Sequence, residues 1–150
     1  MASDEDAKRR FAGYVKLVAQ ENRFISRDEE RRILEEGVTR FNLEMEEARG
    51  IMHGVADDND FAIERDVDRR MHAVLERFAG KRGVIDRKRF EDATAIYSRL
   101  THGAITGEDA RKRVKVIVEE HGWKVRRAGP LGTKRWYTQI GKQRRRLGFA

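Results

Sequence analysis

The stretch Arg23-Phe24-Ile25-Ser26-Arg27-Asp28-Glu29 predicts a corner between two helices. Ser26 and Glu29 have the spacing of a capping box, in which two side chains satisfy free backbone N–H groups at the start of a helix. Ile25 stands directly before the cap, where a hydrophobic staple fixes the angle at which the chain enters the helix. A helical pattern resumes immediately after Ser26, so the stretch predicts one helix ending before it and another beginning after it.

The same pattern recurs at Gly83-Val84-Ile85-Asp86 and at Gly103-Ala104-Ile105-Thr106. In both, an isoleucine precedes a residue that favours the N-cap position, and Thr106 with Asp109 is a weaker capping box. Gly83 and Gly103 suit the left-handed backbone that often ends the preceding helix. The three corners are unequally spaced, which argues against a regular solenoid.

Up to His121, the hydrophobic residues recur with a period near 3.6, which predicts about six amphipathic helices. We therefore expect a mainly α fold in which a compact helical bundle spans residues 1–121 and buries the apolar stripes as its core. The stripes contain Phe11, Tyr14, Val15 and Val18; Leu34, Val38 and Phe41; Ala48, Ile51, Met52 and Val55; Ile63, Val67, Met71, Val74, Leu75 and Phe78; Phe90, Ala93, Tyr97 and Leu100; and Ala110, Val114, Ile117 and Val118.

Over residues 8–121, the corners and the rhythm of the helices resemble the tellurite-resistance protein B family. The resemblance implies an all-helical fold, in which acidic residues at the turns are candidate metal ligands. The corresponding positions here are Asn22-Arg23, Arg82-Gly83 and His102-Gly103, so the turn aspartate is missing at all three corners. We expect no metal and no cofactor.

One acidic cluster, Asp57-Asp58-Asn59-Asp60 with Glu64, stands apart from these corners. A calcium loop needs oxygen ligands at alternating positions and a glycine at its sharp turn, and the cluster offers neither in any frame. Carboxylates also stabilise the positive end of a helix, so we interpret the cluster as a helix N-terminus.

The charge of the chain is unevenly distributed. The chain has 33 Lys and Arg against 26 Asp and Glu, a net charge of +7, and it has no cysteine, which excludes disulfides and thiolate metal sites. Residues 122–150 contain nine of the basic residues and no acidic one, so the rest of the chain has 24 against 26, a balance of −2. This asymmetry indicates a polyanionic partner for the C-terminal segment.

Residues 122–141 have a different pattern, with two-residue alternation in Trp123-Lys124-Val125 and an aromatic and β-branched run at 134–140. The only proline lies between the two, in Ala128-Gly129-Pro130-Leu131-Gly132-Thr133. This pattern predicts a basic β-hairpin packed on the helices, with Trp136, Thr138 and Ile140 on one face. We expect residues 142–150 to form a flexible basic tail.

Over residues 88–141, a helix with a basic polar side followed by a basic hairpin is similar to the last helix and wing of a winged helix-turn-helix domain. The resemblance implies that the helix lies in a major groove of DNA and that the wing contacts phosphates. The candidate contacts are Arg111, Lys112 and Lys115 in the helix, Arg126, Arg127, Lys134 and Arg135 in the wing, and Lys142, Arg144, Arg145 and Arg146 in the tail. Trp136 and Tyr137 are candidates for stacking on bases as in single-strand binders. Burial is the favoured alternative for Trp136, whereas for Tyr137 burial and stacking are equally open.

No catalytic constellation is present in the sequence. The four histidines lie on separate predicted elements without ligand spacing, and no glycine pattern of a phosphate-binding loop precedes a helix. We therefore expect that the protein is not an enzyme. Without an apolar stretch of about 20 residues or an apolar N-terminal leader, we expect a cytoplasmic protein with no integral membrane association.

Two classes of function fit these observations. The first is a nucleic-acid-binding protein, with DNA favoured over RNA, that contacts the phosphate backbone through its C-terminal helix and hairpin. The second is an adaptor or assembly subunit, whose helical body docks a protein partner or a second copy while the basic tail contacts an acidic protein or a membrane surface. Binding to nucleic acid at several salt concentrations distinguishes them.

Overall fold

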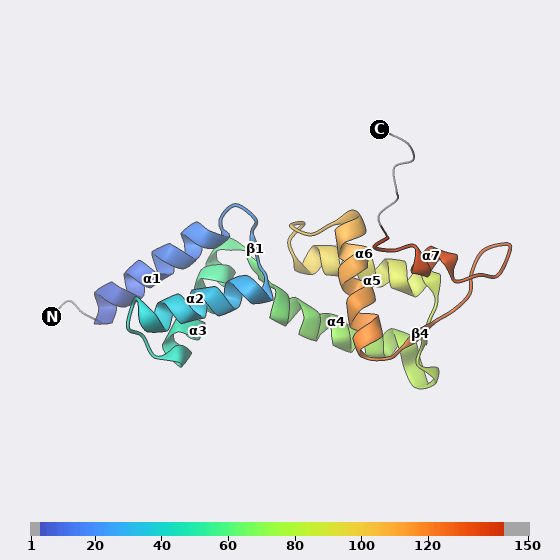
Figure 1. The fold of residues 1–150 in the computed structure, drawn as a ribbon, viewed down its shortest axis with the longest axis horizontal. Helices are drawn as coiled ribbons and strands as arrows, with labels where there is room; N and C mark the ends of the chain where they lie inside the picture. Colours follow the sequence, from blue (N-terminus) through green and yellow to red (C-terminus); the bar gives the residue numbers. More distant parts are fainter. Residues whose placement is uncertain (1–3, 143–150) are drawn as a thin grey trace. The chain divides into compact units, whose positions relative to one another are not determined.

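The computed structural model describes residues 4–142 of the chain, which are mainly helical (Figure 1). The chain forms two compact units. Unit 1 contains residues 1–69 and 99–104, and unit 2 contains residues 70–98 and 105–150. This division differs from the expected single helical region over residues 1–121.

Unit 1 contains three complete helices and a pair of very short strands. The chain runs through α1 (Asp4–Ala19), β1 (Phe24–Ile25), α2 (Arg27–Thr39), α3 (Met45–Asn59) and β2 (Ala62–Ile63) into the first residues of α4 (Glu64–Ala79). The two strands are parallel neighbours, with Phe24 opposite Ala62 and Ile25 opposite Ile63.

Unit 2 has the same order of elements. The rest of α4 and a short 3-10 turn, η1 (Gly80–Arg82), lead to β3 (Val84–Ile85), α5 (Arg87–Leu100), α6 (Gly107–Glu120) and β4 (Lys124–Val125). The strands are again parallel, with Val84 opposite Lys124 and Ile85 opposite Val125. A short helix, α7 (Arg135–Thr138), follows β4.

The two units are copies of one helix–strand–helix–helix–strand plan. Strand β1 corresponds to β3 at a shift of 60 residues, and β2 corresponds to β4 at a shift of 62. A left-handed residue precedes each strand at the corresponding position: Arg23 (φ 56°) and Gly83 (φ 66°) before the first strand, and Asp60 (φ 56°) and Gly122 (φ 70°) before the second. The chain therefore contains an internal repeat that the unequal corner spacing concealed.

The helix corners at Ile25 and Ile85 are confirmed. Both isoleucines are fully buried. The Ser26 hydroxyl accepts a hydrogen bond from the Glu29 N–H at 3.2 Å, and the Asp86 carboxylate accepts one from the Arg89 N–H at 2.8 Å. At the third corner, Thr106 begins α6, but no strand forms there.

Residues 57–60 of the acidic cluster lie at the C-terminus of α3, so their interpretation as a helix N-terminus is wrong, whereas Glu64 does begin a helix, α4. Asp57 and Asp58 occupy the last turn of α3, and Asp60 adopts a left-handed conformation as its C-cap. The Asn59 side chain donates to the Val55 carbonyl, and the Phe61 N–H donates to the Ala56 carbonyl, which closes the helix end. Asn and Asp tolerate this conformation better than other non-glycine residues, which explains the cluster's composition.

The predicted C-terminal hairpin is also wrong in its second strand. Residues 124–125 pair with β3, and residues 135–138 form a helix. A single antiparallel bridge joins Ala128 to Thr133 around the proline turn. Tyr137 and Ile140 are both buried, and a spacing of three residues places two side chains on one face of a helix but on opposite faces of a strand.

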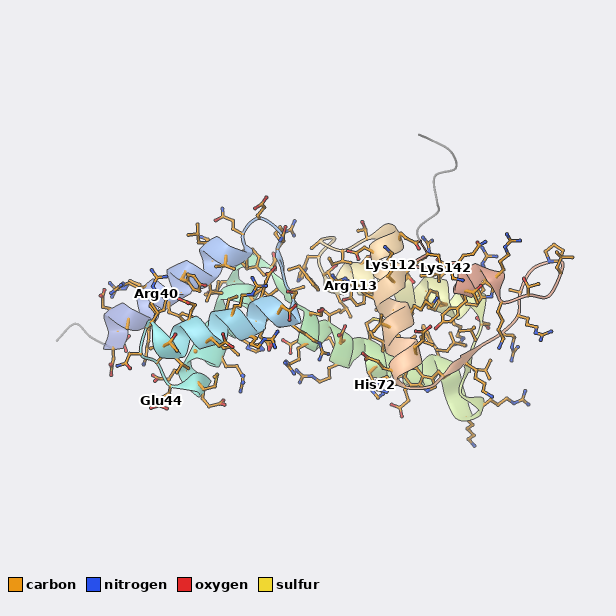
Figure 2. The ribbon with its side chains drawn as sticks, viewed as in Figure 1. Arg40, Glu44, His72, Lys112, Arg113 and Lys142 are labelled. Atoms are coloured by element: carbon orange, nitrogen blue, oxygen red, sulfur yellow. The ribbon has the colours of Figure 1, made fainter. Side chains whose placement is uncertain are left out.

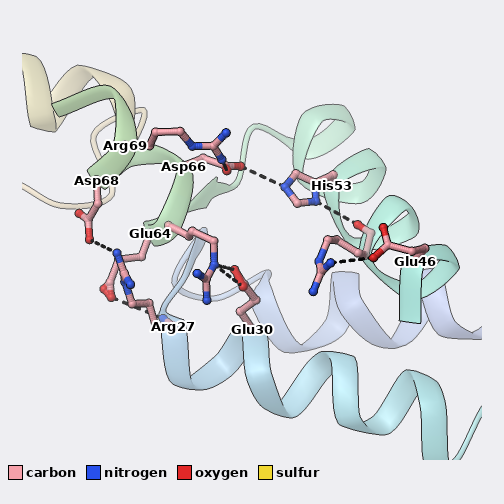
Figure 3. Close-up of polar contacts among 10 residues, drawn as sticks. Arg27, Glu30, Glu46, His53, Glu64, Asp66, Asp68 and Arg69 are labelled. Carbon is pink, nitrogen blue, oxygen red and sulfur yellow. Dashed lines mark hydrogen bonds and ion pairs between the residues drawn. The ribbon is translucent and has the colours of Figure 1, made fainter. Parts of the chain in front are cut away.

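Ion pairs hold the first residues of α4 to α2 and α3 within unit 1 (Figure 3). Arg65 donates to the buried Glu30 carboxylate at 2.9 Å, and Arg27 lies 3.1 Å from the Asp68 carboxylate. His53 Nε2 lies 3.1 Å from the Asp66 carboxylate, and its Nδ1 contacts the Arg49 carbonyl. Ion pairs and hydrogen bonds between charged side chains therefore attach the start of α4 to α2 and α3.

Among the described residues, no helix is both long enough and apolar enough to cross a membrane.

Gly37 marks the closest approach of three helices in unit 1. A Cβ atom at this position of α2 would lie 2.9 Å from Ala48 Cβ in α3 and 3.0 Å from the Phe11 ring in α1. Gly54, in α3, has no neighbouring atom within 4 Å of such a Cβ. The first glycine is required by packing, and the second is not.

We expect Gly37→Ala to lower the free energy of unfolding by about 1–3 kcal/mol, because the added methyl group overpacks the core. The matched control Gly54→Ala should raise it by about 0.5–1 kcal/mol, because alanine favours a helix more than glycine does. Urea unfolding followed by circular dichroism measures both. Equal effects of the two substitutions would contradict the close approach at Gly37.

Candidate nucleic-acid interface

Four of the predicted wing cations surround one loop of unit 2. Arg126 and Arg127 precede the bridge between Ala128 and Thr133, and Lys134 and Arg135 follow it. All four side chains are exposed, and none forms an ion pair with another residue of the described range 4–142. Because residues 122–142 contain no Asp or Glu, this loop has no carboxylate of its own to neutralise it. We call these four residues the loop cations.

A second group of basic side chains lies beside the N-terminal half of α6. Lys112 is exposed, and its Cγ would lie 3.6 Å from a Cβ placed at Gly141. Lys142 is the next residue after Gly141 and therefore lies near Lys112 (Figure 2). The Gly141 N–H donates to the Glu108 carboxylate at 3.2 Å, which ties this end of the chain to α6. The predicted tail contacts Arg144, Arg145 and Arg146 lie outside the described residues.

Arg111 is not a free cation, contrary to the prediction. Its guanidinium contacts the Glu91 carboxylate at 3.1 Å and lies 3.7 Å from that of Glu108. The hydrogen bond with Glu91 raises the pKa of Arg111 above its usual value. Two carboxylates therefore balance this charge, which the sequence shows only as part of a basic run.

Lys115 is occupied by the short helix that follows the loop. Its ammonium donates to the backbone carbonyls of Tyr137 at 3.2 Å and Ile140 at 3.1 Å, and it lies 4.8 Å from the centre of the Tyr137 ring. A cation at the C-terminal end of a helix satisfies free carbonyls and complements the helix dipole. Lys115 therefore holds α7 against α6, so its ammonium already has partners within unit 2.

Tyr137, for which the sequence leaves burial and base stacking equally open, is buried. Only 9% of the residue is exposed, and its ring packs edge-on against Phe90 at a centroid distance of 5.7 Å. Burial, and then the nearby Glu119 carboxylate, raise the pKa of its phenol well above the usual value. Tyr137 anchors α7 to the core of unit 2.

Trp136 is the aromatic side chain that remains accessible. It is half-buried, and its indole N–H donates to the Arg126 carbonyl at 3.1 Å. Its ring packs edge-on against Phe90, with the ring centroids 5.5 Å apart. It also forms part of the wall of an open groove of about 740 Å³, which we call the α7 groove. The groove is lined by Arg87, Glu91, Glu108, Arg111, Trp136, Gln139, Ile140 and Lys142.

The outer face of α6 does not suit a DNA groove. Four carboxylates, Glu108, Asp109, Glu119 and Glu120, are exposed on this helix, whereas Lys112 is its only fully exposed cation within the described chain. A helix inserted in the major groove lies between two rows of phosphates, which repel carboxylates. The electrostatics therefore favour contact through the loop cations and the two lysines over insertion of α6.

Two histidines that the sequence separates lie together in unit 2. The rings of His72 in α4 and His121 after α6 are 3.8 Å apart between centroids, and both lie beside Trp123. No group of three or more His, Cys, Asp or Glu side chains suited to a metal ion occurs in residues 4–142. The histidine contact depends on tertiary packing, so no spacing in the sequence signals it.

We expect Lys115→Met to lower the free energy of unfolding by about 1–3 kcal/mol, because two carbonyls of the α7 segment lose a charged donor. Lys112→Met, one turn earlier on the exposed side of the same helix, should change it by less than about 0.5 kcal/mol. Thermal unfolding of the two variants compares these roles directly. A neutral Lys115→Met variant would contradict the structural role.

We expect the stability of the protein to decline above about pH 10, partly through Tyr137. The folded protein keeps this phenol protonated at a pH where the unfolded chain ionises it, so the stabilisation is fully present below the unfolded pKa and is lost as the pH rises beyond it. Tyr137→Phe, which keeps the ring, should make this decline shallower. Melting temperatures of both proteins between pH 8 and 11 measure the difference, and parallel curves would contradict it.

Comparison of the chain with family models, with curated proteins and with solved structures gives no match in any of the three. A proposal for the function of this protein is therefore based on the charges and contacts of unit 2.

Proposed function

We propose that this protein is a nucleic-acid-binding protein and not an enzyme. In this proposal, the basic surface of unit 2 contacts the phosphate backbone of the nucleic acid. The carrying observation is a group of six exposed cations with no ion pair among residues 4–142: the four loop cations, Lys112 and Lys142. Lys and Arg that neutralise phosphates release condensed counterions, which is the main source of sequence-independent affinity.

Unit 1 provides a contrast that supports this assignment. Arg27, Arg31, Arg49 and Arg65 each lie within ion-pair distance of a carboxylate in the same unit. Because these charges are already balanced, a polyanion gains less from contacting them. Unit 1 also has exposed cations without an ion pair among residues 4–142, such as Arg9 and Lys16, but acidic residues occur in the same segments, whereas residues 122–142 have none.

The order of elements also supports the proposal. Helices α5 and α6 follow each other along the chain and the basic loop comes after them, which is the order of the last two helices and the wing in a winged helix-turn-helix domain. We propose that the loop contacts phosphates as a wing does, while α6 stays outside the groove because of its exposed carboxylates. DNA remains the favoured polymer in this proposal.

An adaptor role is the second candidate, and exposed apolar side chains on unit 1 favour it. Leu17 is 74% exposed on α1, and Met45 is 41% exposed at the start of α3, where a protein partner or a second copy has apolar side chains to cover. In that case, the loop cations would contact an acidic protein or an anionic membrane surface. Binding to short nucleic acids separates the two candidates.

We expect a labelled DNA of about 20 nucleotides to bind with an affinity that falls steeply with salt. If all six cations contact phosphates, the slope of log K against log salt approaches about −5 on duplex and about −4 on a single strand. Replacing the four loop cations with alanine should weaken binding and make the slope shallower by about 3–4. Fluorescence anisotropy at four salt concentrations measures both quantities.

The matched control removes the same amount of charge elsewhere, in the variant R9A, K16A, R70A and R77A. All four side chains are exposed, and none forms an ion pair within the described chain. This variant should retain nearly the original affinity and slope, because its substitutions lie outside the basic surface. Equal loss in both variants would show that only net charge matters, and no binding at low salt would contradict the proposal.

A further inference from the structure

We propose that the α7 groove accepts an unpaired base of a single-stranded nucleic acid, stacked against Trp136. This inference rests on the proposed function and names its substrate class. Its starting point is that unit 2 combines an accessible aromatic ring, free cations and fixed hydrogen-bonding groups in one open groove of about 740 Å³. Grooves of this size accommodate ligands of several hundred daltons, which includes a nucleotide.

Trp136 is held in place by one hydrogen bond and two edge-on ring contacts. Its indole N–H is fixed by the Arg126 carbonyl, and its ring is supported by Phe90 at 5.5 Å and Tyr137 at 5.6 Å. The residue is nevertheless only half-buried and lines the groove. A preorganised ring loses little conformational freedom when a base stacks on it, and each base has a π-face to offer.

The other lining groups fit the rest of a nucleotide. Arg87 and Lys142 have no ion pair among residues 4–142 and are suited to flanking phosphates. Gln139 supplies an amide donor and acceptor. Glu91 and Glu108, held by Arg111, supply carboxylates that accept hydrogen bonds from amino groups on base edges.

These carboxylates also favour a base over a phosphate at their own place in the groove. Glu91 and Glu108 repel a phosphate beside them, whereas a neutral base finds acceptors there for its N–H groups. The phosphates on either side of the base can then lie at Arg87 and Lys142. A base in a duplex presents its face to its neighbours and must be unstacked at a cost of a few kcal/mol before it reaches a protein ring. The groove is therefore predicted to prefer single strands.

The internal repeat provides a natural comparison. The corresponding groove in unit 1 has a volume of about 400 Å³ and is lined by α2, α3 and Arg65, with Arg27 and Arg49 at the positions of Arg87 and Arg111. No aromatic side chain lines it, and its arginines are ion-paired. Trp136, Gln139 and Lys142, which all come from the segment after the repeat, therefore distinguish the groove of unit 2.

The fluorescence of Trp136 provides a direct test. Because the chain has two tryptophans, Trp123→Phe leaves Trp136 as the only one. This variant is titrated with a 12-nucleotide oligodeoxycytidine, whose bases each carry an amino group, and with a 12-base-pair duplex. We expect the single strand to quench the fluorescence, and to bind at least 5-fold more tightly than the duplex at the same salt concentration. Equal affinity for the two without quenching would overturn the inference.

Substitution of Trp136 supplies an independent measurement. Trp136→Leu should weaken binding of the single strand by about 10-fold or more, whereas Trp136→Phe, which keeps an aromatic ring, should recover most of the affinity. Trp123→Leu is the matched control and should have little effect on binding. Circular dichroism verifies that each variant is folded. If Trp136→Leu does not fold, the quenching of Trp136 in the Trp123→Phe variant still tests the inference.

The outcomes separate this inference from the proposed function. If replacing the loop cations weakens binding but Trp136 is neither quenched nor required, the phosphate surface stands and the stacking site is overturned. If quenching occurs and Trp136→Leu weakens binding while the loop-cation variant binds normally, the stacking site stands and the loop surface is wrong. If neither nucleic acid binds at low salt, both proposals are overturned.

Discussion

The pairing of two parallel two-residue strands fixes the architecture of each unit. In unit 1, the Ala62 N–H donates to the Arg23 carbonyl at 3.1 Å, and in unit 2 the Lys124 N–H donates to the Gly83 carbonyl at 2.9 Å. Each strand is flanked by helices, so these few hydrogen bonds determine where four helix ends meet. The left-handed residues before the strands turn the chain into this pairing, and fully buried Ile25 and Ile85 lock it into the core.

The sequence predicts the helices and two of these corners because periodicity and capping are local properties. It does not predict the strand pairs, since two residues are too short for alternation to be visible. The repeat is also concealed, because corresponding buried positions have different side chains: Phe11 corresponds to Met71, and Gly37 to Tyr97. A bulky residue in one unit is compensated by a small one nearby, so the plan of the fold persists while residue identity does not.

The candidate interface could be predicted as a charge but not as a geometry. Exposed cations around the loop follow from a segment without carboxylates, which composition alone reveals. Whether a basic residue is free depends on partners distant in sequence. Composition therefore did not reveal that Arg111 pairs with Glu91 or that Lys115 binds the carbonyls of the α7 segment. The alternation of aromatic and polar residues in 134–140 suggested a strand, but the burial of both Tyr137 and Ile140 requires a helix.

One pair of corresponding residues explains why the two units differ in their unpaired charge and in the lining of their grooves. Glu30 and Phe90 both occupy the fourth position of the second helix and are both buried. A buried carboxylate requires a cationic partner, and Arg65 of the helix after β2 supplies it. A buried ring requires apolar cover, and the segment after β4 supplies it with Trp136 and Tyr137. Because Phe90 has no charge and needs no ionic partner, the cations of the segment after β4 stay without a carboxylate partner. The packing of this segment on Phe90 also places Trp136 in the wall of the α7 groove.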